Sequence, residues 1–277
     1  MAEPEPARRN SLTRSAPAGA VPPSASVDGV LVGFVAAAGA EIDRLFRAAM
    51  EACARSGGAA LRDRYGAGYG ELLIDFRTVL AAPHGIVTAA AIAEVMRYHD
   101  SADVESSIRR AEDRGAVIRD DAGQIRATPA GRAFFDDLYA AQADALGSLW
   151  AEADESLARL TAITGELVVA ASLDPLLAVG AFTAMTPNYE PIGTPATVLL
   201  LNRLSALRYH RSDAHAIAWR SVGLSATEMV AIQGLGGSRR DAIEARTNEI
   251  AAAPFRILAE DRRRILLADL RSMPVPG

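Results

Sequence analysis

The sequence has little cysteine, few aromatic residues and no lysine. All 29 basic residues are arginine. A single cysteine, Cys53, excludes an intramolecular disulfide framework and is typical of a protein from a reducing cytoplasm. Aromatic residues make up 5% of the chain, so a buried core must be built mainly from Ala, Leu, Val and Ile.

The sequence also lacks an apolar run long enough to cross a bilayer, which needs about 20 residues. The stretch VLVGFVAAAGA, residues 30–40, is too short, and the run 167–185 is interrupted by Asp174 and Pro175. The basic residues near the N-terminus are followed by Ser and Pro, not by the apolar segment of a signal peptide. We therefore expect a cytoplasmic protein that makes no membrane contact.

The chain is long enough for one large domain or two small ones, with 277 residues of which half are hydrophobic. Residues 1–27 are rich in Pro, Ser and Ala, a composition that predicts a disordered tail. Helical periodicity then predicts a helical N-terminal region over 28–160 and a helical C-terminal domain over 161–277. The net charge of −5 offers no overall electrostatic attraction to nucleic acid.

A compact order of elements is predicted within residues 84–135. Thr88 can cap one helix and Asp100 or Ser101 a second, which Gly115 ends. Two short strands, AVIRD and QIRAT, are joined by the turn signal DAG. Thr128 and Pro129 then start a helix of some thirty residues that links the two halves. This order is that of a winged helix-turn-helix, so the predicted fold is mainly α with a small β-hairpin wing.

The stretch SSIRRAEDRGAVIRDDAGQIRATPAGRAFFDDL, residues 106–138, resembles the recognition helix, wing and following helix of MarR-type regulators. Residues 114–117 and 128–132 match the two motifs that those regulators share. The resemblance implies a DNA-binding fold, in which the candidate DNA contacts are Ser106, Ser107, Arg109, Arg110, Arg119 and Arg126. Between residues 88 and 128, however, eight acidic residues outnumber six basic ones, whereas DNA binders present a positive face. A winged-helix scaffold that touches no DNA is therefore the alternative.

A helix predicted to start near Ala196 contains LNRLSALRYHRSDAHAIAW, residues 201–219. On a helical wheel, Arg208, Arg211 and His215 fall in the same sector as the leucine stripe, whereas His210 points away. His210 and His215 are five residues apart, not the four that place two histidines on one metal ion. The spacing therefore argues against a metal site and favours an anion site of two guanidiniums and one imidazole.

The counter-charge for that face has two possible sources. A later helix carries Glu244, Thr247 and Asn248 on one side, so an internal Arg–Glu network between two helices is one interpretation. The other is a pocket for a small anionic ligand, lined by Arg208, Arg211, His215, Glu244, Thr247 and Asn248. The sequence leaves both interpretations open.

Two segments in this half, LRYHRSDAHAIAWRSVGLSATEM and IEARTNEIAAAP, are similar to a family of actinobacterial helix-turn-helix-like proteins. That family carries an R-x-H-R-x-D-x-H helix followed by I-E-x-x-T-D-x-x-A-x-x-P. The aligned residues are Arg208, His210, Arg211, Asp213, His215, Glu244 and Thr247. Asn248 stands where the family usually has Asp. The resemblance implies a helical fold and the position of a site, not an activity.

Three functions remain open. The first is a homodimeric, ligand-responsive transcriptional regulator that binds DNA and an anionic effector. The second is a small helical enzyme, in which His215 is the acid or base, Arg208 and Arg211 hold an oxyanion or phosphate, and Glu244 orients the imidazole. The third is a plain interaction protein. No nucleophile motif, P-loop or dinucleotide fingerprint occurs in the sequence, so we expect no cofactor and favour a non-enzyme.

Overall fold

The computed structural model describes residues 29–232 and 237–277, so the predicted disordered tail lies outside the described residues. The fold is mainly helical with one two-stranded antiparallel sheet, which confirms the predicted mainly α class. No helix in the described ranges is both long enough and apolar enough to span a membrane.

The first half of the chain contains seven helices and both strands within its described residues. Their bounds are α1 (Gly29–Ser56), α2 (Gly58–Tyr65), α3 (Glu71–Asp75), α4 (Arg77–Leu80), α5 (Ala89–Val95), α6 (Ser101–Asp113), β1 (Val117–Arg119), β2 (Ile125–Ala127) and α7 (Pro129–Leu149). Helices α3 and α4 are separated by Phe76, whose fully buried side chain belongs to the core.

The caps predicted around the hairpin are confirmed. The hydroxyl of Thr88 accepts from the backbone of Ala91 at 3.1 Å, and the carboxylate of Asp100 accepts from Ala102 at 2.8 Å. Gly115 has a φ of +68°, which favours glycine after the end of a helix. The Thr128 hydroxyl caps α7.

The two strands pair in the register Val117↔Ala127 and Arg119↔Ile125. An isolated bridge between Val87 and Ile125 joins the segment before α5 to strand β2. The segment that starts α5 is therefore tied directly to the hairpin.

The predicted thirty-residue helix from Pro129 is wrong in length. Helix α7 ends at Leu149, and a separate helix, α8, begins at Asp154. Trp150 stands at the break with 1% of its surface exposed, and its indole nitrogen donates to the carbonyl of Pro274 at 3.2 Å. The chain turns here because this large side chain is buried against the C-terminal segment.

The second half is entirely helical in its described part. Its elements are α8 (Asp154–Ser172), η1 (Pro175–Leu177), α9 (Ala181–Met185), α10 (Ala196–Ser221), α11 (Ala226–Ile232), α12 (Ser238–Ala251), η2 (Pro254–Ile257) and α13 (Glu260–Ser272). Helix α10 begins directly after Pro195, as predicted, and packs against α1, α7, α8, α9 and α12.

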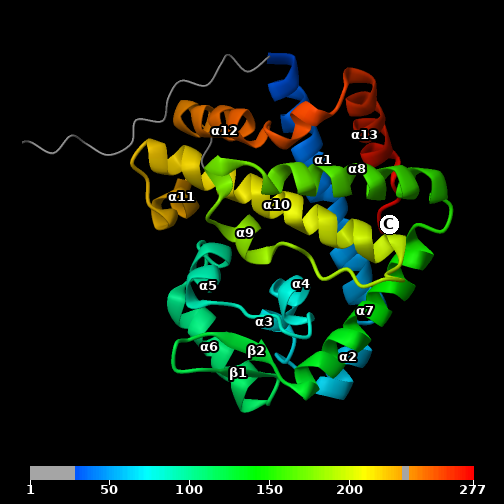
Figure 1. Ribbon diagram of the computed structural model, residues 1–277, viewed down its shortest axis with the longest axis vertical. Coiled ribbons are helices and arrows are strands. Elements are labelled where there is room, and N and C mark those ends of the chain that lie inside the picture. The colour runs from blue at the N-terminus through cyan, green and yellow to red at the C-terminus, as the bar shows by residue number, and fades with distance from the viewer. Residues whose placement is uncertain (1–28, 233–236) are drawn as a thin grey trace, which may run out of the picture.

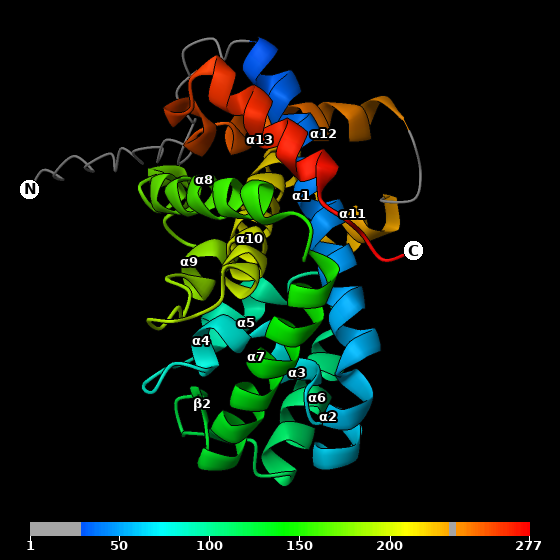
Figure 2. The same cartoon turned by 90° about the vertical axis from the view of Figure 1, so that its right-hand side faces the viewer.

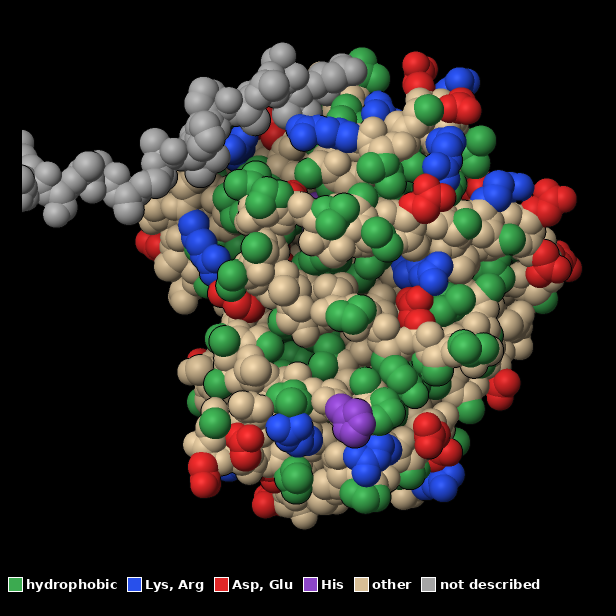
Figure 3. Space-filling view, in the orientation of Figure 1, with side chains coloured by type: hydrophobic (Ala, Val, Ile, Leu, Met, Phe, Trp, Pro, Cys, Tyr) green, Lys and Arg blue, Asp and Glu red, His purple; other side chains and the backbone are tan. Residues whose placement is uncertain are grey.

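A segment that is apolar nearly all round, such as residues 166–185, should be buried or lie in a dimer interface. This segment is not fully buried in the chain, because four of its side chains are more than half exposed: Val169, Leu173, Leu176 and Val179. Figure 3, drawn in the orientation of Figure 1, shows hydrophobic side chains at the surface over α8.

Two hydrophobic clusters form the interior. The larger one combines α1 and the end of α7 with α8, α10, α12 and α13. The smaller one lies under α3, α5, α6 and the hairpin. Helices α1 and α7 run along both parts of the molecule and join them (Figures 1 and 2). The larger cluster therefore draws on residues from both sides of position 160.

Candidate anion-binding site

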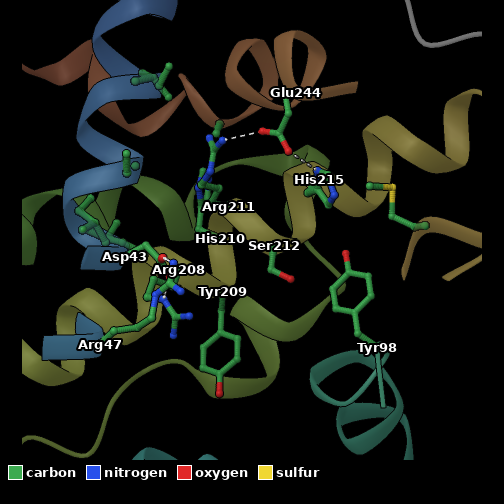
Figure 4. Close-up of a pocket in the computed structure, with 18 of the residues that line it drawn as sticks. Asp43, Arg47, Tyr98, Arg208, Tyr209, His210, Arg211, Ser212, His215 and Glu244 are labelled. Atoms are coloured by element: carbon green, nitrogen blue, oxygen red, sulfur yellow. Dashed lines mark hydrogen bonds and ion pairs between the residues drawn. The ribbon is translucent and has the colours of Figure 1, made fainter. Parts of the chain in front are cut away.

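A cavity of about 820 Å³ lies between α1, α10, α11 and α12 (Figure 4). Part of its wall is apolar and includes Val35 and Ile42 from α1 and Met229 from α11. Tyr98, in the turn that follows α5, also lines the cavity. The cavity thus contacts both the C-terminal helices and the segment that carries the hairpin.

Four of the six predicted ligand-binding residues line this cavity, namely Arg208, Arg211, His215 and Glu244. The other two, Thr247 and Asn248, do not belong to its wall, but they contact His215 and Arg211. The structure therefore brings all six side chains together, with Thr247 and Asn248 as supports.

Arg208 is held by α1. Its Nε donates to a carboxylate oxygen of Asp43 at 2.9 Å, and its guanidinium carbon lies 4.2 Å from the ring centroid of Phe46. A cation over an aromatic face is attracted by the ring quadrupole. Asp43 also pairs with Arg47, one turn further along α1. One carboxylate is therefore shared by two guanidiniums.

Arg211 is held by α12. Its guanidinium donates to Glu244 at 3.0 Å and to the side-chain oxygen of Asn248 at 2.6 Å. Burial lowers the pKa of Arg211, and the carboxylates of Glu244 and Asp43 oppose that shift. Gly39 makes room for this side chain, because a Cβ there would lie 3.2 Å from the Arg211 Cδ.

His215 is held by α12. Its Nδ1 lies 3.0 Å from the Thr247 hydroxyl, which also lies 2.8 Å from the carbonyl oxygen of Ile243. When the hydroxyl donates to that carbonyl, Nδ1 donates to the hydroxyl oxygen and Nε2 is left as an acceptor. Burial lowers the pKa of His215; the Glu244 carboxylate, 3.8 Å away, opposes this shift, and Arg211 reinforces it. The imidazole is therefore neutral near pH 7.

The cavity wall carries more positive than negative charge. Four guanidiniums line it, from Arg47, Arg208, Arg211 and Arg240, against the two carboxylates of Asp43 and Glu244. With neutral histidines the lining has a net charge of +2. No ion pair joins Arg240 to any other residue in the described part of the chain. Sequence reasoning missed Asp43, Arg47 and Arg240, because helical spacing within one element cannot show which other helices lie beside it.

A buried ion pair connects α10 to the region of the hairpin. Arg97 pairs with Asp213, and both side chains are 4% exposed. The Asp213 carboxylate also accepts from the backbone nitrogens of Ala181 at 3.0 Å and Phe182 at 2.8 Å. This contact was not predicted, since Arg97 carries no signal in the sequence beyond its charge.

Tyr98 strengthens the same connection. Its hydroxyl accepts from the indole nitrogen of Trp219 at 3.1 Å, and the Tyr98 side chain lines the cavity. A side chain that contacts the cavity is therefore fixed both to the turn after α5 and to the end of α10.

The candidate DNA contacts lie on α6 and the hairpin, but acidic neighbours neutralise several of them. Arg119 makes hydrogen-bonded ion pairs with Glu105 and Glu112, at 2.9 Å and 2.6 Å. Arg110 pairs with Glu71 at 2.8 Å. It also donates to the hydroxyls of Ser106 and Ser107, both at 2.8 Å.

Two of these arginines are more accessible. The side chain of Arg109 is 65% exposed and lies 3.8 Å from Glu105. Arg126 is also exposed, on the outer side of β2, and pairs with no carboxylate of the described residues. The exposed positive charge on this face is therefore limited to a few side chains.

No group of three or more His, Cys, Asp or Glu side chains that could hold a metal ion occurs within residues 29–232 and 237–277. Comparisons of the chain with protein-family models, with curated proteins and with solved structures gave no match. The chemistry of the site therefore rests on the geometry of this chain alone.

Proposed function

We propose that this protein binds an amphipathic organic anion, a carboxylate or phosphate monoester on an apolar body, as the effector of a cytoplasmic regulator. The excess of guanidinium over carboxylate groups around one cavity carries this proposal. Guanidinium groups bind carboxylates and phosphates in bidentate geometry. The apolar wall formed by Val35, Ile42 and Met229 would receive the body of the ligand.

The experiment uses octanoate and octyl phosphate as anionic probes and 1-octanol as the uncharged comparator. The protein is labelled with [methyl-¹³C]methionine, and the Met229 methyl resonance, assigned with Met229→Leu, reports on the cavity. We expect both anions to shift this resonance and the alcohol to bind at least tenfold more weakly. Equal binding of octanoate and octanol would contradict an anion site.

Arg240 offers a direct test of the charge. Arg240→Met should weaken octanoate binding about tenfold, which corresponds to about 1.4 kcal/mol, and leave thermal stability unchanged because no ion pair is lost. Arg239→Met is the matched control, since the adjacent Arg239 is exposed and donates to the backbone carbonyl of Val222. Equal effects of the two substitutions would argue against a role for Arg240.

Within this proposal, residues 84–135 form a winged helix-turn-helix that binds DNA as part of a homodimer. The order α5, α6, β1, β2, α7 supports it, and the Arg97–Asp213 pair would couple the unit to the ligand cavity. An electrophoretic shift assay at low salt, on the DNA upstream of the protein's own gene, tests this claim. The absence of retardation would contradict DNA binding, and residues 84–135 would then be a scaffold in a ligand-binding protein.

An enzyme is the alternative function, and the geometry of His215 favours it over a plain interaction protein. The imidazole is neutral, its Nδ1 is fixed by Thr247, and Nε2 is available as a base beside the arginines. Turnover of a bound ester or phosphate, lost in His215→Gln, would support this function. Stable binding of such a ligand without product formation would support the effector role.

A further inference from the structure

A second, smaller pocket of about 290 Å³ lies between α1, α2, α3 and α7. Its wall is mainly apolar and aromatic, and includes Met50, Leu138, Tyr65, Tyr69 and Phe134. The centroids of the three rings lie 5.2 to 5.3 Å from one another. Such a wall suits a small flat molecule.

Two polar groups in this wall lack partners. Gln142 is 0% exposed, and neither its side-chain oxygen nor its nitrogen makes a hydrogen bond in the described part of the protein. The hydroxyl of Tyr69, a residue 5% exposed, is also without a partner there. Buried polar groups in folded proteins are almost always satisfied, so each such exception requires an explanation. Gln142 and Tyr69 are both among the residues that line the same pocket.

The pocket has no buried charge. Its two charged lining residues, Arg62 and Glu71, are exposed at the rim. Cys53 also lines the pocket, and burial raises the pKa of its thiol to about 11, so it stays protonated. An ion would lose its hydration in this pocket without gaining a counter-charge. The complementary ligand is therefore neutral.

We propose that this pocket is a second ligand site, specific for a small, flat, neutral molecule that carries a carboxamide or lactam group. Such a group donates one hydrogen bond and accepts another, and it can pair with the amide of Gln142 in both directions. The hydroxyl of Tyr69 supplies a further contact, and the aromatic wall receives the ring. The site differs in position and in charge from the anion cavity and does not depend on it.

The test uses benzamide as the probe, with benzoate and toluene as charged and apolar comparators of similar size. In [methyl-¹³C]methionine-labelled protein, Met50 reports on this pocket and Met229 on the anion cavity. We expect benzamide to shift Met50 and not Met229, and to bind at least tenfold more tightly than either comparator. Absence of a Met50 shift, or equal binding of toluene, would overturn the proposal without affecting the anion site.

Gln142→Met removes the amide and keeps a chain of similar length. Benzamide affinity should fall at least tenfold, while the midpoint of thermal unfolding stays equal or rises, because an unpaired buried amide is lost. Gln124→Met, in the hairpin turn, is the matched control and should change neither quantity. A lower midpoint for Gln142→Met would show that the amide has a structural partner and would overturn the proposal.

The tyrosines give an internal check within the pocket. Tyr69→Phe should weaken benzamide binding several-fold, because the hydroxyl contact is lost. Tyr65→Phe should leave it unchanged, since the Tyr65 hydroxyl already donates to Asp137 at 2.6 Å. Equal effects of the two substitutions would mean that the Tyr69 hydroxyl does not contact the ligand.

Discussion

At the scale of single residues, the charged side chains of α10 are each held by a different helix. Arg208 is paired with α1, Arg211 with α12, and Asp213 with Arg97 beyond the end of α5. The internal network and the ligand pocket, which the sequence leaves open as alternatives, share the same residues. Internal carboxylates hold the arginines in place, and the cavity they line is still positively charged.

Asp213→Asn should destabilise the protein more than any surface substitution. Loss of the carboxylate leaves Arg97 buried with Glu94, at 3.1 Å, as its remaining charge partner, and breaking a buried pair costs up to about 3–5 kcal/mol. Urea unfolding followed by circular dichroism measures this change. Glu51→Gln is the control, because the Glu51–Arg55 pair is exposed and worth less than about 0.5 kcal/mol. Equal losses in the two variants would contradict the role of the Arg97–Asp213 pair.

His210 should make the protein less stable in acid. The ring is 1% exposed and packs edge-on against Phe182 with the ring centroids 5.6 Å apart, and burial lowers its pKa to about 4. In the unfolded chain the pKa is about 6.5. Between these values only the unfolded state binds the proton, so stability falls as the pH drops from 6.5 to 4, by about 3 kcal/mol in all.

The comparison of wild type with His210→Gln isolates this contribution. The glutamine variant should lose less free energy of unfolding than the wild type between pH 6.5 and pH 4, as measured by urea unfolding at each pH. Identical pH dependence in the two proteins would mean that the pKa of His210 is the same in the folded and the unfolded state.

At the scale of elements, the hairpin sits directly on the first turn of α7. Thr128 caps this helix and donates to the carbonyl of Gly115 at 2.5 Å, and Gly131 lies one turn further on. A Cβ on Gly131 would lie 2.1 Å from the carbonyl oxygen of Ala116. The close approach of helix and hairpin therefore requires a glycine at this position.

Two glycines in α7 provide a matched pair. Gly131→Ala should destabilise the protein, because the helix and the hairpin must move apart to accept the Cβ. Gly147→Ala, where a Cβ would meet nothing within 4 Å, should stabilise it by about 0.5–1 kcal/mol through helix propensity. Thermal unfolding distinguishes the two. A stabilising Gly131→Ala would show that the hairpin is not held against α7.

At the scale of the whole molecule, an apolar surface remains along α8 and the segment that follows it. A surface of this kind on a protein of this size is typical of an interaction site. The sequence allows burial or a dimer interface for this run, and the chain itself leaves Val169, Leu173, Leu176 and Val179 exposed. A homodimer through this surface is thus the form that we predict in solution.

Light scattering coupled to gel filtration tests the dimer. Wild type should have twice the chain mass of 29.1 kDa, and Leu173→Asp should have the mass of one chain, because a charge in an apolar interface is costly. Ile118→Asp, at an exposed apolar position in β1, is the control and should stay dimeric. A wild-type protein with the mass of one chain would show that the prediction is wrong.

The sequence by itself determined the local features: the helix caps at Thr88, Asp100 and Thr128, the hairpin, and the common face of Arg208, Arg211 and His215 on α10. These depend on interactions within a few residues along the chain, so they can be read from spacing and residue type. The break after α7 was missed because its cause, Trp150, contacts a segment more than a hundred residues away.

Only the tertiary structure decided which groups meet. Asp43 reaches Arg208 across 165 residues of sequence, and Arg97 reaches Asp213 across 116. The larger cavity forms where α1 meets helices of the second half, and the smaller pocket forms among α1, α2, α3 and α7 of the first half. Such contacts depend on how all the helices pack at once, and the periodicity of one element does not encode the neighbour that it will have.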